Sequence, residues 1–341
     1  MISKLHKGIV HRERNRLMKK KVFVGAALSA LLVYLSIRGI DFEDVAAGFR
    51  TIDYGYVLPA LALLFLMQAL RSVRWGVILS PLAKIDQLSL FSVTSVGFLA
   101  IVALPARLGE LARPYLITKK SDIRLSAALG TIIVERIFDS LTVLVIAAFL
   151  FFFIPLPTWL IRAGGLFFLA TLALLTATTL MIVKREASLR VLTALSGYLP
   201  PRLAEGLKRL TGHFIEGLKT IADPALLISV TGLSFSIWLV DVLAIYLLFL
   251  AFGFQLPAAA AFVLMIILII GIAIPTAPGF VGNWHYSCVL GLSLFGIPKA
   301  EALTFAIIYH ALSIALVAVL GGAFLPFNRF SFADLRKQMQ S

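Results

Sequence analysis

Three charged side chains stand close together in an otherwise apolar part of the chain. Arg107, Glu110 and Arg113 lie in the stretch LPARLGELARPYL at residues 104–116, between two long apolar runs. Their spacing of three residues would place them near one face wherever the backbone is helical. Arginines can hold a phosphate through bidentate hydrogen bonds, and a glutamate can orient one of them or receive a cationic group. The stretch predicts a site for a lipid head group; the alternative is an ion network that only fixes a broken helix.

A second charged group follows within the next apolar run. Glu135, Arg136 and Asp139 are spaced i, i+1 and i+4. Charged residues inside a membrane are costly and usually line a polar cavity or pair with one another. Two interpretations stay open for this group: direct contact with the substrate, or a structural brace to Arg107 or Arg113.

A third stretch, IPTAPGFVGNWH at residues 274–285, interrupts a helix without using charge. Pro275 and Pro278 cannot continue a helical hydrogen-bond ladder, and Gly279 and Gly282 expose backbone that a ligand can approach closely. Such breaks are tolerated at membrane depth inside protein or against a wet cavity. We expect this break to face the one around Arg107, although a simple packing kink would use the same residues.

Isolated titratable residues complete the candidates. His285 and His310 could bind substrate or form hydrogen bonds in the cavity, and Asp241 and His285 could couple transport to protons. We expect Arg71 and Arg74 to extend to the cytoplasmic interface along their apolar stems. With one cysteine and histidines that lack nearby carboxylates, the sequence predicts no metal site. We also predict no cofactor and no catalytic residue.

The composition places these residues in a membrane protein. Hydrophobic residues make up 60% of the 341 residues and charged residues 14%, which excludes an ordinary soluble domain. The net charge of +14 arises at the ends of apolar runs and lacks interleaved aromatic residues, which favours a membrane surface over nucleic acid as partner.

The apolar runs predict an all-α polytopic membrane protein with about six full spans and two opposed re-entrant broken-helix hairpins, in a single membrane domain at residues 1–341. The full spans are expected at residues 22–37, 57–80, 131–154, 159–183, 226–254 and 300–325. Residues 89–104 form a short apolar arm. A complete crossing there would put the next basic cluster outside, so we expect a hairpin that enters from the cytoplasm. Residues 258–295 form the second hairpin, entering from the other side.

The distribution of basic residues predicts the orientation. Only Arg38, Arg50, Arg162 and Lys299 of the 31 lysines and arginines would lie outside. Both termini are therefore expected in the cytoplasm, in the plasma or inner membrane. Residues 184–223 are basic, with apolar residues at steps of three and four, and predict an amphipathic helix on the cytoplasmic surface.

The order of elements also suggests two inverted halves. Residues 57–154 contain a span, a broken hairpin and a span, and residues 226–325 contain the same series in the opposite orientation. Inverted repeats with broken helices at the midplane are typical of secondary transporters.

The ordered motifs resemble those of a known family, the transmembrane region of lysylphosphatidylglycerol synthases, or flippase-like domain family. Its Pro-x-Arg-x-Gly-Glu-x-x-Arg block is found at residues 105–113, its Glu-Arg-x-x-Asp motif at 135–139 and its Pro-x-x-Pro-Gly-x-x-Gly segment at 275–282. The resemblance covers residues 22–325. His285 and His310 stand where many members carry an acid and an arginine, and the soluble aminoacyl-transferase domain is absent. The resemblance therefore implies lipid handling and not lysine transfer.

We thus expect a flippase-like lipid translocator that binds the phosphate-bearing head group of a phospholipid, aminoacyl-phospholipid or polyprenyl-linked lipid. Its partners would be membrane lipids, and the oligomeric state is not indicated. Two alternatives remain: an integral membrane transferase acting on a lipid-linked substrate, and a scaffold for a lipid-modifying enzyme.

Overall fold

The computed structural model describes residues 23–104, 109–184, 211–218, 223–274 and 276–328. Within these ranges every regular element is helical and no residue forms a strand. The predicted all-α class is confirmed.

Several helices are long and apolar enough to cross a membrane. They are α3 (Val57–Leu79, preceded by the short turn η1 at Tyr54–Tyr56), α7 (Thr158–Val183), α10 (Pro224–Ala251) and α13 (Lys299–Phe324). The helix Phe23–Ile37 and α2 (Phe42–Arg50) form a bent pair, with 78° between them, that could supply a fifth span. Helix α6 (Leu125–Phe151) has 27 residues, or about 40 Å, but contains three charged residues. These helices give a polytopic membrane protein.

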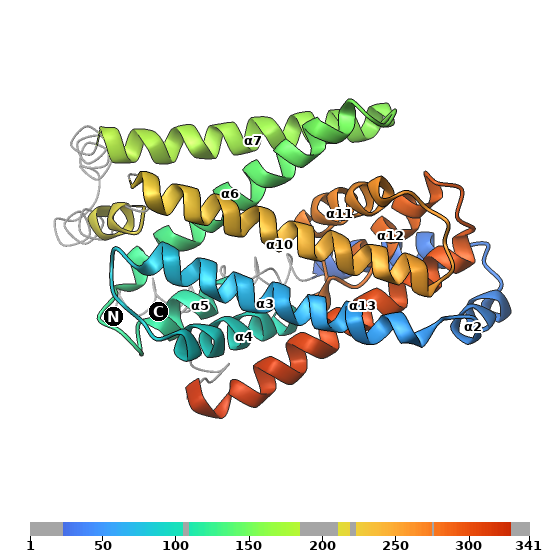
Figure 1. The fold of residues 1–341 in the computed structure, drawn as a ribbon, viewed down its shortest axis with the longest axis horizontal. Coiled ribbons are helices and arrows are strands. Elements are labelled where there is room, and N and C mark those ends of the chain that lie inside the picture. Colours follow the sequence, from blue (N-terminus) through green and yellow to red (C-terminus); the bar gives the residue numbers. More distant parts are fainter. Residues whose placement is uncertain (1–22, 105–108, 185–210, 219–222, 275, 329–341) are drawn as a thin grey trace, which may run out of the picture.

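Two antiparallel helices, α3 and α10, form the centre of the molecule (Figure 1). The end of α10 is tied to the segment before α3, because the Asp53 amide donates to the Ala251 carbonyl at 2.8 Å. Both helices carry isolated polar residues on their apolar surfaces. Their contact therefore brings polar groups together that lie more than 150 residues apart in sequence.

Two broken hairpins enter from opposite ends of this centre (Figure 1). The first consists of α4 (Gln87–Ala103) and α5 (Ala112–Ile117), and the second of α11 (Ala258–Ala273), η4 (Pro278–Phe280) and α12 (Asn283–Ser293). None of the four arms reaches the roughly 20 residues that a full crossing needs. The predicted opposed hairpins are present. The division at residues 57–154 and 226–325 remains a prediction.

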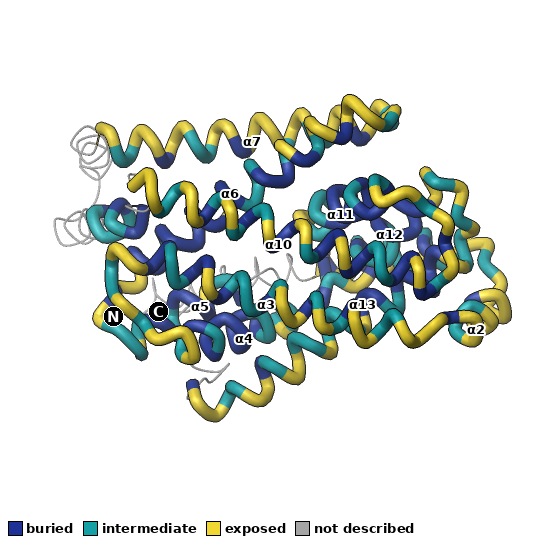
Figure 2. Tube along the Cα trace, in the orientation of Figure 1, coloured by how far each residue is buried: buried dark blue, intermediate teal, exposed yellow. Residues whose placement is uncertain are grey.

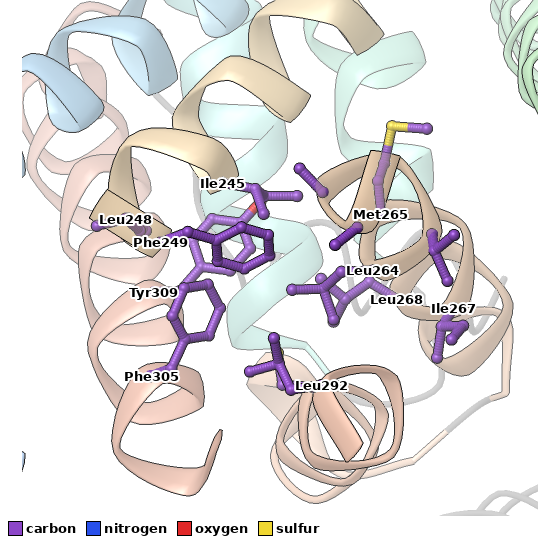
Figure 3. Close-up of a cluster of buried hydrophobic side chains, with 14 of the residues drawn as sticks. Ile245, Leu248, Phe249, Leu264, Met265, Ile267, Leu268, Leu292, Phe305 and Tyr309 are labelled. Carbon is purple, nitrogen blue, oxygen red and sulfur yellow. The ribbon is translucent and has the colours of Figure 1, made fainter. Parts of the chain in front are cut away.

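The apolar core surrounds the second hairpin. Phe249 of α10, Leu264 of α11, Leu292 of α12 and Phe305 of α13 are each fully buried and belong to one cluster (Figure 3). Tyr309 joins the same cluster but carries a polar hydroxyl to its edge. This packing fixes the second hairpin against α10 and α13.

Helix α7 lies at one side of the molecule, and α6 runs obliquely from the centre to meet it (Figure 1). Most residues of α7 are exposed, and its buried residues are limited to Leu160, Thr171 and Thr178 (Figure 2). A long apolar helix with so little protein contact needs an apolar surrounding, which a bilayer provides.

Basic residues lie at both ends of the molecule. Arg38 and Lys299 lie together, because the Lys299 ammonium donates to the Arg38 carbonyl at 2.6 Å. The described loops at the opposite end contain Lys84, Lys119 and Arg124. The side of the membrane that each end faces stays a prediction.

The described part of the segment 184–223 packs closely against α6. Residues 211–216 are helical, Ile215 and Leu218 are buried, and Leu218 belongs to a cluster with Val134 and Phe138 of α6. Gly217 faces Gly130 of α6 so closely that a side chain would collide with the α6 backbone. The segment is docked here; the rest of the predicted amphipathic helix lies outside the described residues.

Candidate functional site

A cavity of about 230 Å³ lies between the two hairpins, where α3, α4, α6, α10, α11 and α13 meet. Among the described residues, its charged lining consists of Arg71, Arg74, Arg113, Arg136, Glu110, Glu135, Asp139 and Asp241. The remaining wall is mostly apolar and includes Ile101, Val102, Leu268, Ile272 and Val317. The site therefore pairs a charged side with an apolar side, as an amphipathic ligand would require.

Arg113 connects the first hairpin to α6. Its guanidinium makes two hydrogen bonds to Glu135, at 2.6 and 3.3 Å, and both side chains are almost fully buried. It also lies 4.2 Å from the Trp75 ring. Gly97 of α4 makes room for this arginine, because a Cβ there would overlap the Arg113 stem. Glu135 thus acts as the brace to Arg113 that was one of the two interpretations.

Arg74 is part of the same network, and the expectation that it extends to the interface is wrong. Its guanidinium lies 2.6 Å from Asp139 and 3.6 Å from Glu135, and it donates to the Ser234 hydroxyl at 2.9 Å. Only 2% of its side chain is exposed. Helix α3 turns this arginine toward α6 and α10 and away from the lipid-facing surface.

Arg71 stands one turn before Arg74 and has a different surrounding. Its guanidinium lies 4.9 Å from the Phe98 ring and lines the cavity. Among the described residues, no carboxylate is within ion-pair distance of Arg71. The prediction that it extends to the interface is wrong as well, and it supplies a cation available to a ligand.

The other members of the predicted charged groups are placed less centrally. Glu110 lines the cavity from the 3-10 turn before α5, so it does not share one helix with Arg113. Arg136 also lines it, with 44% of its side chain exposed and Asp139 at 3.7 Å. Arg107 lies outside the described residues, so the predicted common face of residues 107, 110 and 113 cannot be assigned.

Asp241 faces the cavity from α10. The Tyr309 hydroxyl donates to its carboxylate at 2.8 Å, and both residues are buried. This hydrogen bond leaves further acceptor positions on the carboxylate. Asp241 is therefore a candidate acceptor site for a ligand.

The second break is held by neutral groups. Thr276 donates to the Asn283 side chain at 2.9 Å, and the Asn283 amide donates to the carbonyls of Gly271 and Ile274 at 3.1 and 3.2 Å. His310 contacts the Gly279 carbonyl at 2.7 Å. These bonds satisfy backbone groups that the break releases.

The proline and glycine positions of this motif contribute by shape. Pro278 begins η4, and Gly279 and Gly282 have φ angles of 70° and 95° that L-residues rarely adopt. Phe280, between them, lines the cavity. Pro275 lies outside the described residues. The turn η4 lies against α4 of the first hairpin, and the expectation that it faces the break around Arg107 stays a prediction.

Comparison with known families identifies the scaffold. The family model described as the lysylphosphatidylglycerol synthase TM region matches residues 22–321. The chain belongs to this family. The match includes all the cavity-lining residues described above.

The relatives that sequence comparison finds have low sequence identity to this chain. A UPF0104 membrane protein of Methanothermobacter thermautotrophicus is 23% identical over 93% of this chain and 98% of its own length. A UPF0104 membrane protein of Methanocaldococcus jannaschii is 26% identical over 64% of this chain and 89% of its own. Glycosyltransferase AglD of Haloferax volcanii is 24% identical over 92% of this chain, which corresponds to 56% of that protein. No solved structure matches.

Within this member of the lysylphosphatidylglycerol synthase TM region family, the two candidate histidines have different positions. His310 lines the cavity and stacks on Trp284, with ring centroids 5.0 Å apart. His285 contacts the edge of His310 at 4.9 Å but does not line the cavity. His285 is thus a neighbour of the site and not part of its wall. Among the described residues no group of three potential ligands could hold a metal ion.

Sequence reasoning missed several lining residues of this family member: Gln68, Arg71, Arg74, Trp238, Trp284 and Tyr309. Gln68, Arg71 and Arg74 are spaced by three along α3 and so share one face. This polar face is the feature of the sequence that could have identified the lining residues of α3.

Proposed function

We propose that the protein moves an amphipathic lipid between membrane leaflets by binding its phosphate-bearing head group in the cavity between the hairpins. The observation that carries the proposal is Arg71: a guanidinium in the cavity wall with no ion-pair partner among the described residues. Arg74 and Arg113 are held by carboxylates at 2.6 Å, so they shape the wall while Arg71 receives the ligand.

The two sides of the cavity suit the two parts of a lipid. The phosphate would lie at Arg71, where bidentate hydrogen bonds are available. The tails would leave past the half-buried apolar residues Ile101 and Val102 of α4 and Val317 of α13, and remain in the bilayer. Hairpins that enter from opposite ends could expose the site alternately to the two leaflets, as in transporters with inverted repeats.

The test is translocation of labelled lipids in proteoliposomes, comparing wild type with Arg71→Gln. Loss of a charged hydrogen-bond donor should lower the rate by about 10-fold or more. Arg162→Gln is the matched control, because Arg162 is exposed on α7 and distant from the lining. Equal rates for wild type and Arg71→Gln would overturn the assignment of the site, and absence of lipid movement by folded protein would overturn the function.

The similarity to glycosyltransferase AglD favours one alternative, a role in transfer to or from a lipid-linked substrate. The shared region is 56% of that protein, so its printed activity could belong to the remaining part. Incubating purified protein with a polyprenyl-phosphoryl sugar and following release of the sugar separates the alternatives. Turnover without lipid movement would favour a transferase; a protein inactive in both assays would favour the scaffold.

The proposed setting is the plasma or inner membrane with cytoplasmic termini, supported by the basic loops at one end. Cys288 is buried, so single-cysteine labelling is practicable. Lys119→Cys should be protected from an impermeant thiol reagent in intact cells, whereas Glu43→Cys should react. The reverse pattern would invert the orientation.

A further inference from the structure

Two buried indole N–H donors in the cavity wall have no hydrogen-bond partner among the described residues. The indole nitrogens of Trp238 and Trp284 are buried without a hydrogen-bond partner, and both residues line the cavity. Gln68, whose exposed fraction is 3%, lines the same cavity with a side-chain amide that can both donate and accept. Buried polar groups are normally satisfied, so unpaired donors around a cavity indicate a ligand that supplies acceptors.

These donors lie around Asp241. Trp238 is one turn before Asp241 on α10, and Tyr309, which donates to Asp241 at 2.8 Å, packs against Trp284 with ring centroids 5.0 Å apart. On the facing helix α3, Gln68 is one turn before Arg71. The antiparallel contact of α3 and α10 brings the two pairs to one cavity.

The chemistry of this group separates two kinds of head group. An ammonium group offers only donors, so it could donate to Asp241 or to the Gln68 carbonyl but would leave both indole N–H groups without an acceptor. A hydroxyl both donates and accepts, so neighbouring hydroxyls could donate to Asp241 and accept from the indoles. Aromatic rings beside such hydroxyls also offer flat surfaces for the C–H face of a sugar-like ring.

We propose that Gln68, Trp238, Asp241 and Trp284 form a subsite for a polyhydroxylated ring, such as a sugar or inositol, attached to the phosphate that Arg71 binds. This inference rests on the proposed function and narrows its substrate class. The subsite is separate from the ion-pair network, since none of its four residues pairs with Arg74 or Arg113. The ring could be carried by a glycerolipid or by a polyprenyl phosphate, because the recognised chemistry is the same.

The experiment measures binding of short-chain lipids to the full-length protein in detergent, by calorimetry. The probes are dihexanoyl phosphatidylinositol, dihexanoyl phosphatidic acid, dihexanoyl phosphatidylethanolamine and citronellyl phosphoryl mannose. We expect the two ring-bearing lipids to bind about 10-fold more tightly than phosphatidylethanolamine, the gain expected from a few additional hydrogen bonds. The stronger of the two ring-bearing lipids identifies the carrier.

The matched variants are Trp238→Phe and Trp284→Phe, which keep an aromatic ring and remove the N–H donor. Each should weaken binding of the ring-bearing lipids about fivefold and leave phosphatidic acid unchanged. Trp159→Phe is the control, because Trp159 is 39% exposed on α7 and does not line the cavity.

The results distinguish failure of the ring subsite from failure of the proposed function. Phosphatidylethanolamine binding as tightly as phosphatidylinositol, or a Trp238→Phe effect equal for all lipids, overturns the ring subsite alone. If phosphatidic acid binds and depends on Arg71 while rings add nothing, the translocator proposal survives without this subsite. If none of the probes binds to folded protein, both proposals fall.

Discussion

The two hairpins solve the same problem with different chemistry. In the first, the return arm is fixed by a buried charge pair, Arg113 with Glu135, at 2.6 Å. In the second, the break is fixed by neutral hydrogen bonds from Asn283 and His310 to backbone carbonyls. A helix that breaks at membrane depth must satisfy the backbone groups that the break frees, but either a buried charge pair or neutral hydrogen bonds can hold it in place.

The comparison shows where charge is useful. The first hairpin faces α3 and α6, whose charges shape the cavity wall, so its anchor is part of the same electrostatic network. The second hairpin faces the apolar core and the aromatic residues, where an uncompensated charge would be costly. One side of the cavity is thus set by ion pairs and the other by backbone shape.

Removing the shared carboxylate should have the largest effect. In Glu135→Gln, Arg113 and Arg74 lose the anion that both contact. Breaking a buried pair in this way typically costs about 3–5 kcal/mol, and we expect a large fall in thermal stability in detergent. Arg136→Gln is the control, because its 44% exposed side chain should contribute less than about 1 kcal/mol. Equal stability of the two variants would show that the first hairpin is not anchored by charge.

A backbone change should break the second hairpin by a smaller amount. Gly282 has φ of 95°, and a Cβ there would lie 2.6 Å from the Ser29 carbonyl. We expect Gly282→Ala to lower the free energy of unfolding by about 1–3 kcal/mol. Gly164→Ala on α7, where nothing lies within 4 Å, should be neutral or slightly stabilising. A neutral Gly282→Ala would contradict the close contact between the Phe23–Ile37 helix and this break.

The smallest effect should come from the helix caps that begin the two hairpins. Asp86 accepts from the Ser89 amide at 2.8 Å at the start of α4, whereas α11 begins after Pro257 without a side-chain cap. The hydrogen bond from Ser89 lowers the pKa of the exposed Asp86 carboxyl. The contribution of this cap to the free energy of unfolding is therefore fully present above the ordinary aspartate pKa. It disappears as the pH falls through the lowered pKa of Asp86. Asp86→Ala should remove this pH dependence, at a cost below about 1 kcal/mol, measured by thermal unfolding between pH 2 and 6. An unchanged pH profile would exclude the cap as its source.

The helices, the hairpins and the cavity-lining motifs could be predicted from hydropathy, proline and charge. The error concerned Arg71 and Arg74. Near the end of an apolar helix, an arginine that extends to the interface and one that faces another helix give the same hydropathy profile. The distinction depends on which partner faces it, here Asp139 on α6 and Ser234 on α10. Which side chains pair between helices depends on the packing angles of the helices, and these angles cannot be read from a single sequence.

The aromatic side of the site was missed for a related reason. Trp238, Trp284 and Tyr309 stand in apolar helices where aromatic residues are ordinary core residues. Their polar atoms become informative only when burial and hydrogen-bond partners are known. His285 shows the converse, since its residue type suggested a role that its position outside the cavity wall does not support.

The ion pair of Arg74 also constrains biosynthesis. Arg74 leaves the ribosome 65 residues before Asp139 and 160 residues before Ser234. During that interval α3 carries a guanidinium whose burial in lipid costs about 2.5–3.5 kcal/mol even on the insertion scale. Nascent α3 should therefore settle in its final position only after α6 has been made. Chains released before residue 135 should be more sensitive to proteolysis than chains released after residue 151, and equal sensitivity would show that α3 is stable without its partner.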